Sequence, residues 1–201
     1  MFPTVLLVVG PSGSGKTTTV STLVAELRGC RGVISEDIRH NGVRAGLAAR
    51  QVPDGPSTPI AYVVDPDAPL RAGRGSVTLA RYPGEVRGLL RRGPYVFDTD
   101  AMDAICTRLT RRLAPYRNTA APERPVVIVD EVGPIELTGA GWWPLVKTAL
   151  FTATAVVITV RPALADRLVD QLHAVGLATH APVHLHRPGD RAAILATLQP
   201  G

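Results

Sequence analysis

The sequence predicts an α/β fold in which a mostly parallel sheet is flanked by helices. Strand-like apolar runs alternate along the chain with stretches whose apolar residues recur at helical spacing. Because parallel strands must be joined by long crossovers, usually helices, this alternation favours a parallel sheet covered on both faces. The length of 201 residues and the 45% share of hydrophobic side chains suffice for one full core. We therefore expect one domain over residues 1–201.

Four strands are expected at residues 5–9, 126–129, 155–160 and 182–185. The first has no basic flank and is too short to cross a membrane, so we interpret it as a buried strand and not as a signal peptide. No later segment is a candidate for a membrane span either. We therefore expect no membrane association.

Four helices are expected from apolar residues at helical spacing, and each apolar stripe should face the core. The second helix follows Asp98-Thr99-Asp100, whose side chains can accept from free backbone N–H groups, and the fourth starts near Asp190. The stripes are Val20, Leu23, Val24 and Leu27; Met102, Ile105, Leu109 and Leu113; Leu164, Leu168, Leu172 and Val175; and Ile194 with Leu195.

Residues 51–92 interrupt the alternation of strands and helices. Repeated prolines and glycines divide this segment into short extended pieces, such as Ile60 to Val64 and Ser76 to Ala80. We expect an insertion of strands and loops after the second strand of the sheet. Such an insertion can cover a bound nucleotide or extend the sheet at its edge, and the sequence does not separate these roles.

The net charge of +5 admits a nucleic acid, an anionic lipid or a phosphate-rich small ligand as a partner. The basic residues are spread along the chain and interrupted by acids, which does not favour a nucleic acid as the partner. The arginine groups at 87, 91 and 92 and at 108, 111 and 112 resemble exposed helix faces, with nucleic-acid binding as the alternative. Of the 22 basic residues only Lys16 and Lys147 are lysines, which hints that a compact ammonium is needed at residue 16.

The two cysteines, Cys30 and Cys106, are far apart and have no His or Cys neighbour at metal-ligand spacing. The sequence therefore indicates neither a disulfide framework nor a zinc site. A reducing compartment, the cytoplasm, fits this usage best.

The strongest motif follows the first strand directly and reads Gly10-Pro11-Ser12-Gly13-Ser14-Gly15-Lys16-Thr17-Thr18, which contains the G-x-x-x-x-G-K-[ST] pattern. Its glycines let the backbone curl so that N–H groups point at a β-phosphate, and the next helix adds its positive N-terminus. Lys16 should reach the β- and γ-phosphates, and the Thr17 hydroxyl should ligate Mg²⁺. A glycine-rich turn without function is the alternative, and the buried strand before the loop argues against it.

A second motif, Asp130-Glu131, ends the apolar strand at 126–129. The carboxyl ends of parallel strands form the ligand-binding edge of such a sheet. Asp130 would hold Mg²⁺ through its water shell, and Glu131 would orient or deprotonate the attacking water. Two acids after a strand can also be a helix cap or a solvated turn, but the phosphate-binding loop upstream favours the catalytic interpretation.

Three arginines are candidates for contacts with the nucleotide. Arg39 or Arg44 could stabilise charge at the γ-phosphate, or could instead pair with Glu36 or Asp37 on a strand surface. Arg191 could stack on the base, with a solvated helix start as the alternative.

Residues 32–47 resemble the G-F-x-[ST]-E-[ED]-[VI]-R…R-x-G-F segment of the small nucleoside-triphosphatases first described from thermophiles and also called cancer-related nucleoside-triphosphatases. Residues 127–133 with Glu136-Leu137 look like the family's I-D-E-I-G-x-x-E-L box. Residues 93–96 are similar to its G-x-Y-x-V element and residues 188–191 to its P-E-N-R element. The resemblance covers nearly the whole chain in order, and the two longer boxes are fairly specific.

The resemblance implies a RecA-like P-loop domain that hydrolyses ATP, GTP and other nucleoside triphosphates to the diphosphate and phosphate with Mg²⁺. It places nucleotide contacts at Gly10 to Thr17 and at Val127 to Pro134, Gly133 included. Three residues depart from the family's pattern: Leu47 stands for Phe, Pro134 for Lys and Asp190 for Asn. The last two changes put in doubt any role of that Lys or Asn.

Two other functions stay open from the residues alone. The loop also resembles that of nucleotide kinases, and residues 51–92 could then bind a phosphate acceptor. Glu131 favours a hydrolase, and an arginine-rich lid typical of kinases is not evident. A slow nucleotide-dependent switch is the third possibility.

Overall fold

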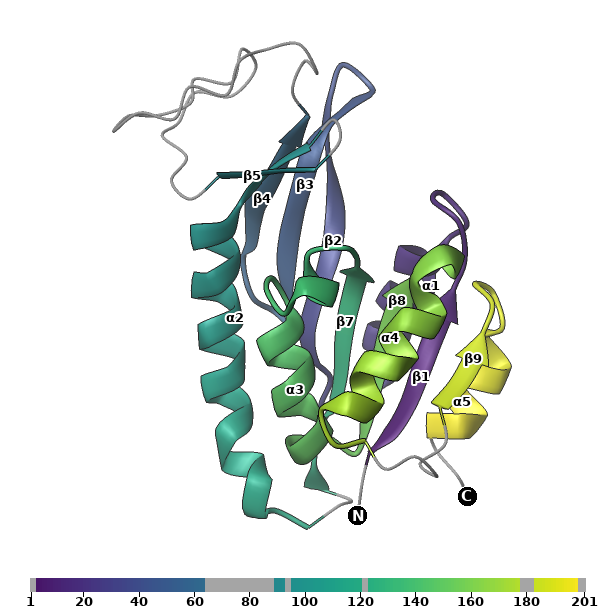
Figure 1. Cartoon of the computed structure of the whole chain (residues 1–201). Coiled ribbons are helices and arrows are strands. Elements are labelled where there is room, and N and C mark those ends of the chain that lie inside the picture. The colour runs from purple at the N-terminus through teal and green to yellow at the C-terminus, as the bar shows by residue number, and fades with distance from the viewer. Residues whose placement is uncertain (1–2, 64–88, 93–94, 121–122, 178–182, 199–201) are drawn as a thin grey trace.

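The computed structural model of the chain describes residues 3–63, 89–92, 95–120, 123–177 and 183–198, whose strands join one nine-stranded sheet (Figure 1). The strand order is β5-β6-β4-β3-β2-β7-β8-β1-β9. The strands are β1 Thr4–Val9, β2 Arg31–His40, β3 Val43–Val52, β4 Ser57–Val63, β5 Leu89–Arg92, β6 Tyr95–Asp98, β7 Val126–Val132, β8 Ala155–Val160 and β9 Val183–His186. The helices are α1 Lys16–Glu26, α2 Thr99–Leu113, α3 Trp143–Thr152, α4 Pro162–Ala174 and α5 Arg191–Leu198, with short 3₁₀ turns η1 Ala114–Asn118 and η3 Glu136–Thr138.

The strands β2, β7, β8, β1 and β9 pair in parallel, and helices cover both faces of this part of the sheet (Figure 1). One core cluster joins these strands to α2, α3 and α4, and a second joins the opposite face to α1 and α5. The parallel sheet flanked by helices that the sequence predicts is therefore confirmed.

The predicted strands and helical stripes match the observed elements closely. In α2 all four predicted stripe residues are buried, and the Asp98 carboxylate caps the helix by accepting from the Ala101 N–H at 2.8 Å. Leu168 and Leu172 of α4 and Ile194 of α5 are fully buried. The helix α3 was not predicted, and its buried face includes Leu145, Val146 and Ala149. Its residues are apolar nearly all round, so they show no stripe.

The antiparallel extension, which we define as β3, β4, β6 and β5 with the outer half of β2, is longer than the sequence suggests. It begins with the hairpin of β2 and β3, so residues 51 and 52 end a long strand instead of opening an insertion. The piece expected at residues 60–64 corresponds to β4, and residues 76–80 lie outside the described residues.

The prediction of a helix face at the first arginine group is wrong for Arg91 and Arg92, which lie in β5 and pair with β6. A strand forms there because residues 89–92 pair antiparallel with β6, the next strand along the chain. Arg87 lies outside the described residues. No helix among the described residues is long and apolar enough to cross a membrane.

Candidate functional site

The phosphate-binding loop connects the carboxyl end of β1 to the first residue of α1, as the sequence predicts (Figure 1). Gly13 and Gly15 have φ angles of 76° and 89°, in the left-handed region that side chains with a Cβ rarely adopt. The loop is closed by Ser14, whose hydroxyl donates to the Pro11 carbonyl at 2.8 Å. The first N–H groups of α1 have no partner within the helix, which suits an anion at this end.

The Lys16 side chain folds back over this loop and is 8% exposed. Its Nζ donates to the Gly10 carbonyl at 2.8 Å and to the Pro11 carbonyl at 2.7 Å. Burial lowers the Lys16 pKa, and the nearby Asp130 and Glu131 carboxylates oppose this shift. Two main-chain carbonyls thus hold the ammonium at the loop.

The Asp130 carboxylate is the most enclosed charged group of the site and is fully buried. Its Oδ1 accepts from the Thr159 hydroxyl at 2.5 Å and from the Glu131 N–H at 3.1 Å. Its Oδ2 accepts from the Thr17 hydroxyl at 2.9 Å and from the Ser35 N–H at 3.1 Å. Burial raises the Asp130 pKa, and these four bonds oppose the shift. The bonds connect β7 to β8, β2 and the start of α1.

Glu131 lies in an irregularity of β7, because the pairing register with β8 shifts between Val129 and Val132. Its φ of 58° is unusual for a residue other than glycine, and its N–H donates to the Thr159 hydroxyl at 2.7 Å. Such bulges and strained residues occur often at active sites, where they redirect a side chain. Burial and the neighbouring Asp130 raise the Glu131 pKa, which Arg44, Arg161 and Lys16 oppose.

The structure brings Arg44 to this carboxylate but not Arg39. The Arg44 guanidinium pairs with Asp37 at 2.8 Å and lies 3.8 Å from Glu131 Oε1, and it also packs over the Tyr95 ring. Arg39 pairs with Asp37 at 2.8 Å and donates to the Gly42 carbonyl at the hairpin tip, with 58% of its side chain exposed. The salt bridge expected as its alternative role is the contact observed.

Arg191 and the turn before α5 lie beside α1. The Arg191 guanidinium donates two hydrogen bonds to the Glu26 carboxylate, so Arg191 forms an ion pair in the described structure. The Gly189 N–H donates to the Thr19 hydroxyl at 3.3 Å, which ties the turn to the first helical residues after the loop. The Thr18 side chain, expected as a nucleotide contact, is exposed.

Two residues in and directly after β8 belong to the site although sequence reasoning missed them. Thr159 is the lone hydroxyl in an otherwise apolar strand and binds Asp130, a signal that could have found it. Arg161 follows the strand directly, and Val160 pairs with both Val9 and Val132. This register places Arg161 at the same edge as the loop and Glu131. In the described part of the chain its side chain has no hydrogen bond or ion pair.

Glu136, which the sequence analysis placed in the family's box without a role, organises the loop after β7. It is 3% exposed, and its carboxylate accepts from the Gly133 N–H at 2.8 Å and from the Trp142 N–H at 3.2 Å. Burial raises its pKa to about 7. Gly133, expected as a nucleotide contact, thus has its N–H engaged with Glu136.

A comparison with known families separates the functions that the residues alone leave open. The model of a family described as NTPase matches residues 5–180. The chain belongs to this NTPase family. Membership confirms the resemblance inferred from the sequence and the predicted class of activity, hydrolysis of nucleoside triphosphates.

Relatives and solved structures agree with this family. The nucleoside-triphosphatase THEP1 of Thermofilum pendens is 30% identical over 159 residues, which cover 77% of this chain and 71% of the relative. A human cancer-related nucleoside triphosphatase has a similar solution structure, with a TM-score of 0.65, 20% identity and coverage of 99% of this chain and 98% of the other. THEP1 from the hyperthermophile Aquifex aeolicus gives a TM-score of 0.64 at 18% identity, over 98% and 97% of the two chains. The predicted P-loop fold of the RecA-like type is therefore confirmed.

Proposed function

We propose that this member of the NTPase family hydrolyses ATP, GTP and other nucleoside triphosphates in a reaction that depends on Mg²⁺. The phosphates would lie in the loop of residues 10–17, against the N-terminus of α1. Lys16 would offset charge on the β- and γ-phosphates in both the ground state and the transition state. The rest of the site then has to position water and to balance the charge that develops.

Thr17 and Asp130 have the chemistry of a magnesium site. Mg²⁺ prefers hard oxygen ligands and binds in such enzymes through one or two protein groups together with substrate phosphates. The Thr17 hydroxyl and the Asp130 carboxylate are in direct contact, and all four hydrogen-bond donors to this buried carboxylate are uncharged. A cation beside it would offset its desolvation. When bound, the ion would neutralise charge on the β- and γ-phosphate oxygens.

Glu131 is the group that we assign to the attacking water. It sits next to Asp130 at the strand end, in the strained conformation that turns it out of the ladder. Its raised pKa, caused by burial and by Asp130, makes it a better base than an exposed glutamate. The observation that carries the proposal is this placement of a carboxylate between Arg44, Arg161 and the Lys16 ammonium.

Arg161 is proposed as a second cation for the γ-phosphate. It lies at the end of β8, between the strands that carry the loop and Glu131, and the field of its guanidinium acts on both Lys16 and Glu131. An arginine so placed can bind phosphate oxygens with two N–H groups at once. Arg44 approaches Glu131 from the other side, so the two arginines would hold charge on both flanks of the reacting phosphate.

The test of this function is the Glu131→Gln variant, with nucleotide titration and single-turnover phosphate release measured on the same protein. The amide keeps the shape but removes the base, so binding should persist while kcat falls by about a hundredfold or more. Unchanged phosphate release would show that Glu131 does not position the water. Faster nucleotide consumption when an acceptor is added would instead indicate a kinase.

Two further expectations remain proposals. Residues 1–201 would form one domain, which the continuity of one sheet through all described strands supports. A cytoplasmic location is supported by the two cysteines, which are free and buried, with burial raising both pKa values to about 11. A limited proteolysis experiment that released a stable fragment would contradict the single domain.

A further inference from the structure

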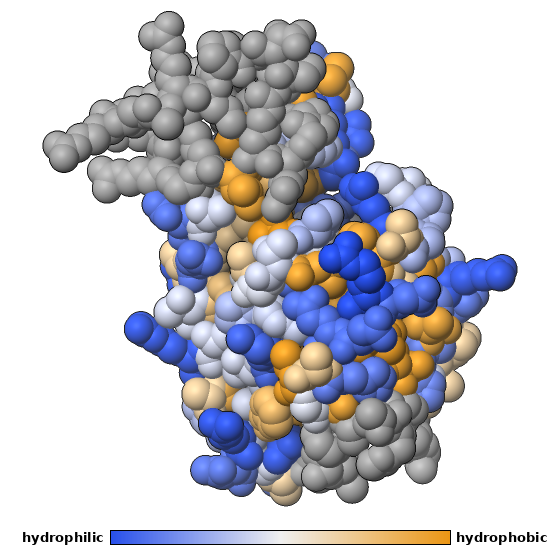
Figure 2. All heavy atoms as spheres, in the orientation of Figure 1, coloured by the Kyte–Doolittle hydropathy of each residue, from blue (hydrophilic) through white to orange (hydrophobic). Residues whose placement is uncertain are grey.

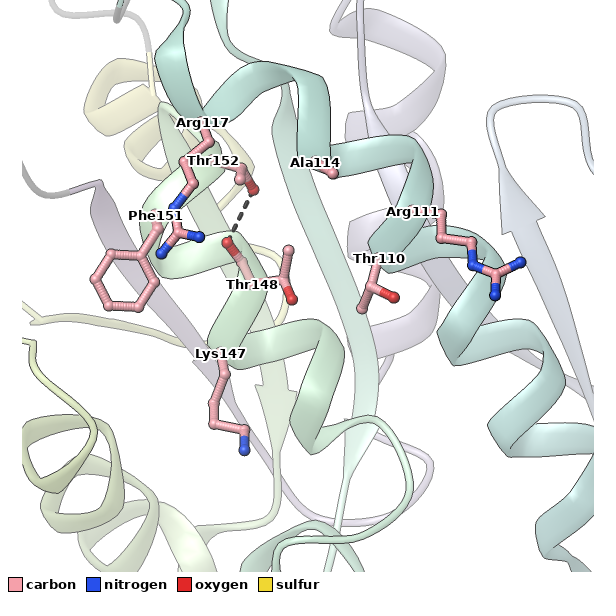
Figure 3. A pocket seen from close by; sticks show the side chains of 8 residues that line it. All are labelled: Thr110, Arg111, Ala114, Arg117, Lys147, Thr148, Phe151 and Thr152. Carbon is pink, nitrogen blue, oxygen red and sulfur yellow. Dashed lines mark hydrogen bonds between the residues drawn. The ribbon is translucent and has the colours of Figure 1, made fainter.

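A groove lies between α2 with η1 on one side and α3 on the other (Figure 3). Its volume is about 450 Å³, within the range of small-molecule sites. η1 and α3 come shortly before β7 and β8 in the chain, so the groove lies toward the amino ends of these strands. The phosphate-binding loop lies at their carboxyl ends, so the groove and the nucleotide site are at opposite ends of the sheet (Figure 1).

The charge around the groove has one sign. Three cations line it, Arg111 of α2, Arg117 of η1 and Lys147 of α3, and no acidic residue does. Between residues 104 and 118 the chain carries four arginines and no acid, and α3 carries only the lysine. Hydrophilic side chains are spaced along the edge of the molecule where α2 runs (Figure 2). A free occupant of this groove should therefore be an anion.

Two of these three cations have no side-chain partner. Within the described ranges, neither Arg111 nor Lys147 has a side-chain hydrogen bond or an ion pair. The last turn of α2 contains Arg111 and Arg112. Cations in the last turn interact favourably with the negative end of the helix dipole. That effect does not account for Lys147, which stands in the middle of α3. The lining hydroxyls of Thr110, Thr148 and Thr152 donate within their own helices, so the cations remain as hydrogen-bond donors for an anion.

An exposed aromatic ring completes the groove. Phe151 is 42% exposed, and the Arg117 guanidinium lies over its ring at 5.9 Å from the centroid (Figure 3). A phenyl ring with a guanidinium beside it is a surface on which a planar base can stack, and stacking tolerates any base. Cations for phosphates next to a ring for bases match the chemistry of single-stranded nucleic acid.

We propose that the groove between α2 and α3 binds single-stranded nucleic acid, with a base on Phe151 and the backbone phosphates on Arg111, Arg117 and Lys147. The sequence favoured a solvated helix face for the arginines of α2. The structure adds Lys147 and Phe151 from α3, which lie some 35 to 40 residues away along the chain and form the other wall. This site is separate from the nucleotide site, so it does not depend on the proposed hydrolysis.

The test is fluorescence anisotropy of a labelled oligodeoxythymidine of about 15 nucleotides, titrated with the full chain at several salt concentrations. Binding should weaken steeply with salt, with a slope of about 0.7 per phosphate contact. Phe151→Ala should weaken it about five- to a hundredfold, because a stacked base is lost. Lys147→Glu should weaken it by about tenfold or more and flatten the salt dependence.

Arg167→Glu supplies the matched control, since Arg167 is exposed on α4, does not line the groove and changes the net charge by the same amount. It should change the affinity by less than about twofold, and Lys16→Ala should leave it unchanged. Phosphate release from ATP by the groove variants reports that they are folded. Equal effects of Arg167→Glu and Lys147→Glu, a neutral Phe151→Ala, or no binding by the wild type would each overturn the proposal. Equal competition by a free mononucleotide would assign the groove to a small nucleotide instead.

Discussion

The parallel part of the sheet and the antiparallel extension hold their charged groups in different ways. At the ends of β1, β7 and β8, Lys16 and Asp130 are buried and each is bound by groups of the main chain or of neighbouring strands. In the hairpin of β2 and β3, Asp37 and Arg39 are partly exposed and pair with each other. The extension reaches Glu131 at one described contact, with Arg44.

This difference indicates which charged groups should be essential for catalysis and which should only adjust its rate. A buried charge is costly without partners, so each partner also fixes its position, and a fixed charge stabilises a transition state without reorganisation. A partly exposed ion pair contributes little to stability and is screened by salt. Groups of the parallel part should therefore be essential, whereas those of the extension should adjust the rate.

Lys16→Ala should give the largest effect. Hydrolysis should fall below detection and triphosphate binding should weaken, because the ammonium balances phosphate charge and also holds the Gly10 and Pro11 carbonyls. The measurements are steady-state phosphate release and nucleotide affinity, with the melting temperature as the control for folding. Turnover at the wild-type rate would remove the phosphate-binding loop from the proposed site.

Removal of the divalent ion should give the second largest effect on hydrolysis. Hydrolysis should stop when a chelator is added and return with Mg²⁺, and Thr17→Ala should raise the Mg²⁺ concentration required by about tenfold or more. Asp130→Asn should act in the same direction, since it keeps the shape and removes the charge. Thr22→Ala on the same helix is a matched hydroxyl deletion, because the one hydrogen bond of the Thr22 hydroxyl within the described part of the chain goes to the Thr18 carbonyl. Activity that resists the chelator would contradict the assignment.

The arginines should separate the two regions. Arg161→Ala should lower kcat by about a hundredfold and Arg44→Ala by about tenfold, with smaller changes in KM, if they bind charge that develops on the γ-phosphate. Arg39→Ala should change kcat by less than about twofold, because its partners are at the hairpin tip. If kcat fell as much in Arg39→Ala as in Arg161→Ala, the distinction between the parallel part and the extension would be wrong.

Glu136 should affect stability more than rate. Its pKa rises from 4.5 to about 7 in the fold, so the unfolded chain ionises first as the pH increases. The free energy of unfolding should therefore fall between about pH 4.5 and about pH 7, by on the order of 3 kcal/mol from this group. In Glu136→Gln this decline should flatten, since the amide does not titrate. Urea unfolding of both proteins across that range measures the difference, and parallel curves would refute the assignment.

The sequence alone was sufficient to predict the local features of this protein. The loop of residues 10–18 and the pair Asp130-Glu131 were found because their function requires consecutive residues next to a strand end. The apolar stripes of α2 and α4 and the Asp98 cap follow from the period of the helix, which any one segment displays. The helix α3 was not predicted because a segment that is apolar nearly all round shows no helical periodicity of its apolar residues.

Only the tertiary structure decided which distant groups meet at the site. Thr159 and Arg161 join Asp130 and Glu131 because β8 is inserted between β1 and β7, an order that no local pattern states. Arg39 and Arg44 are paired across one hairpin, and only the tertiary structure shows that Arg44 reaches Glu131 whereas Arg39 binds the Gly42 carbonyl at the hairpin tip. Local sequence determines which groups a strand end offers, and the strand order and register decide which of those groups act together.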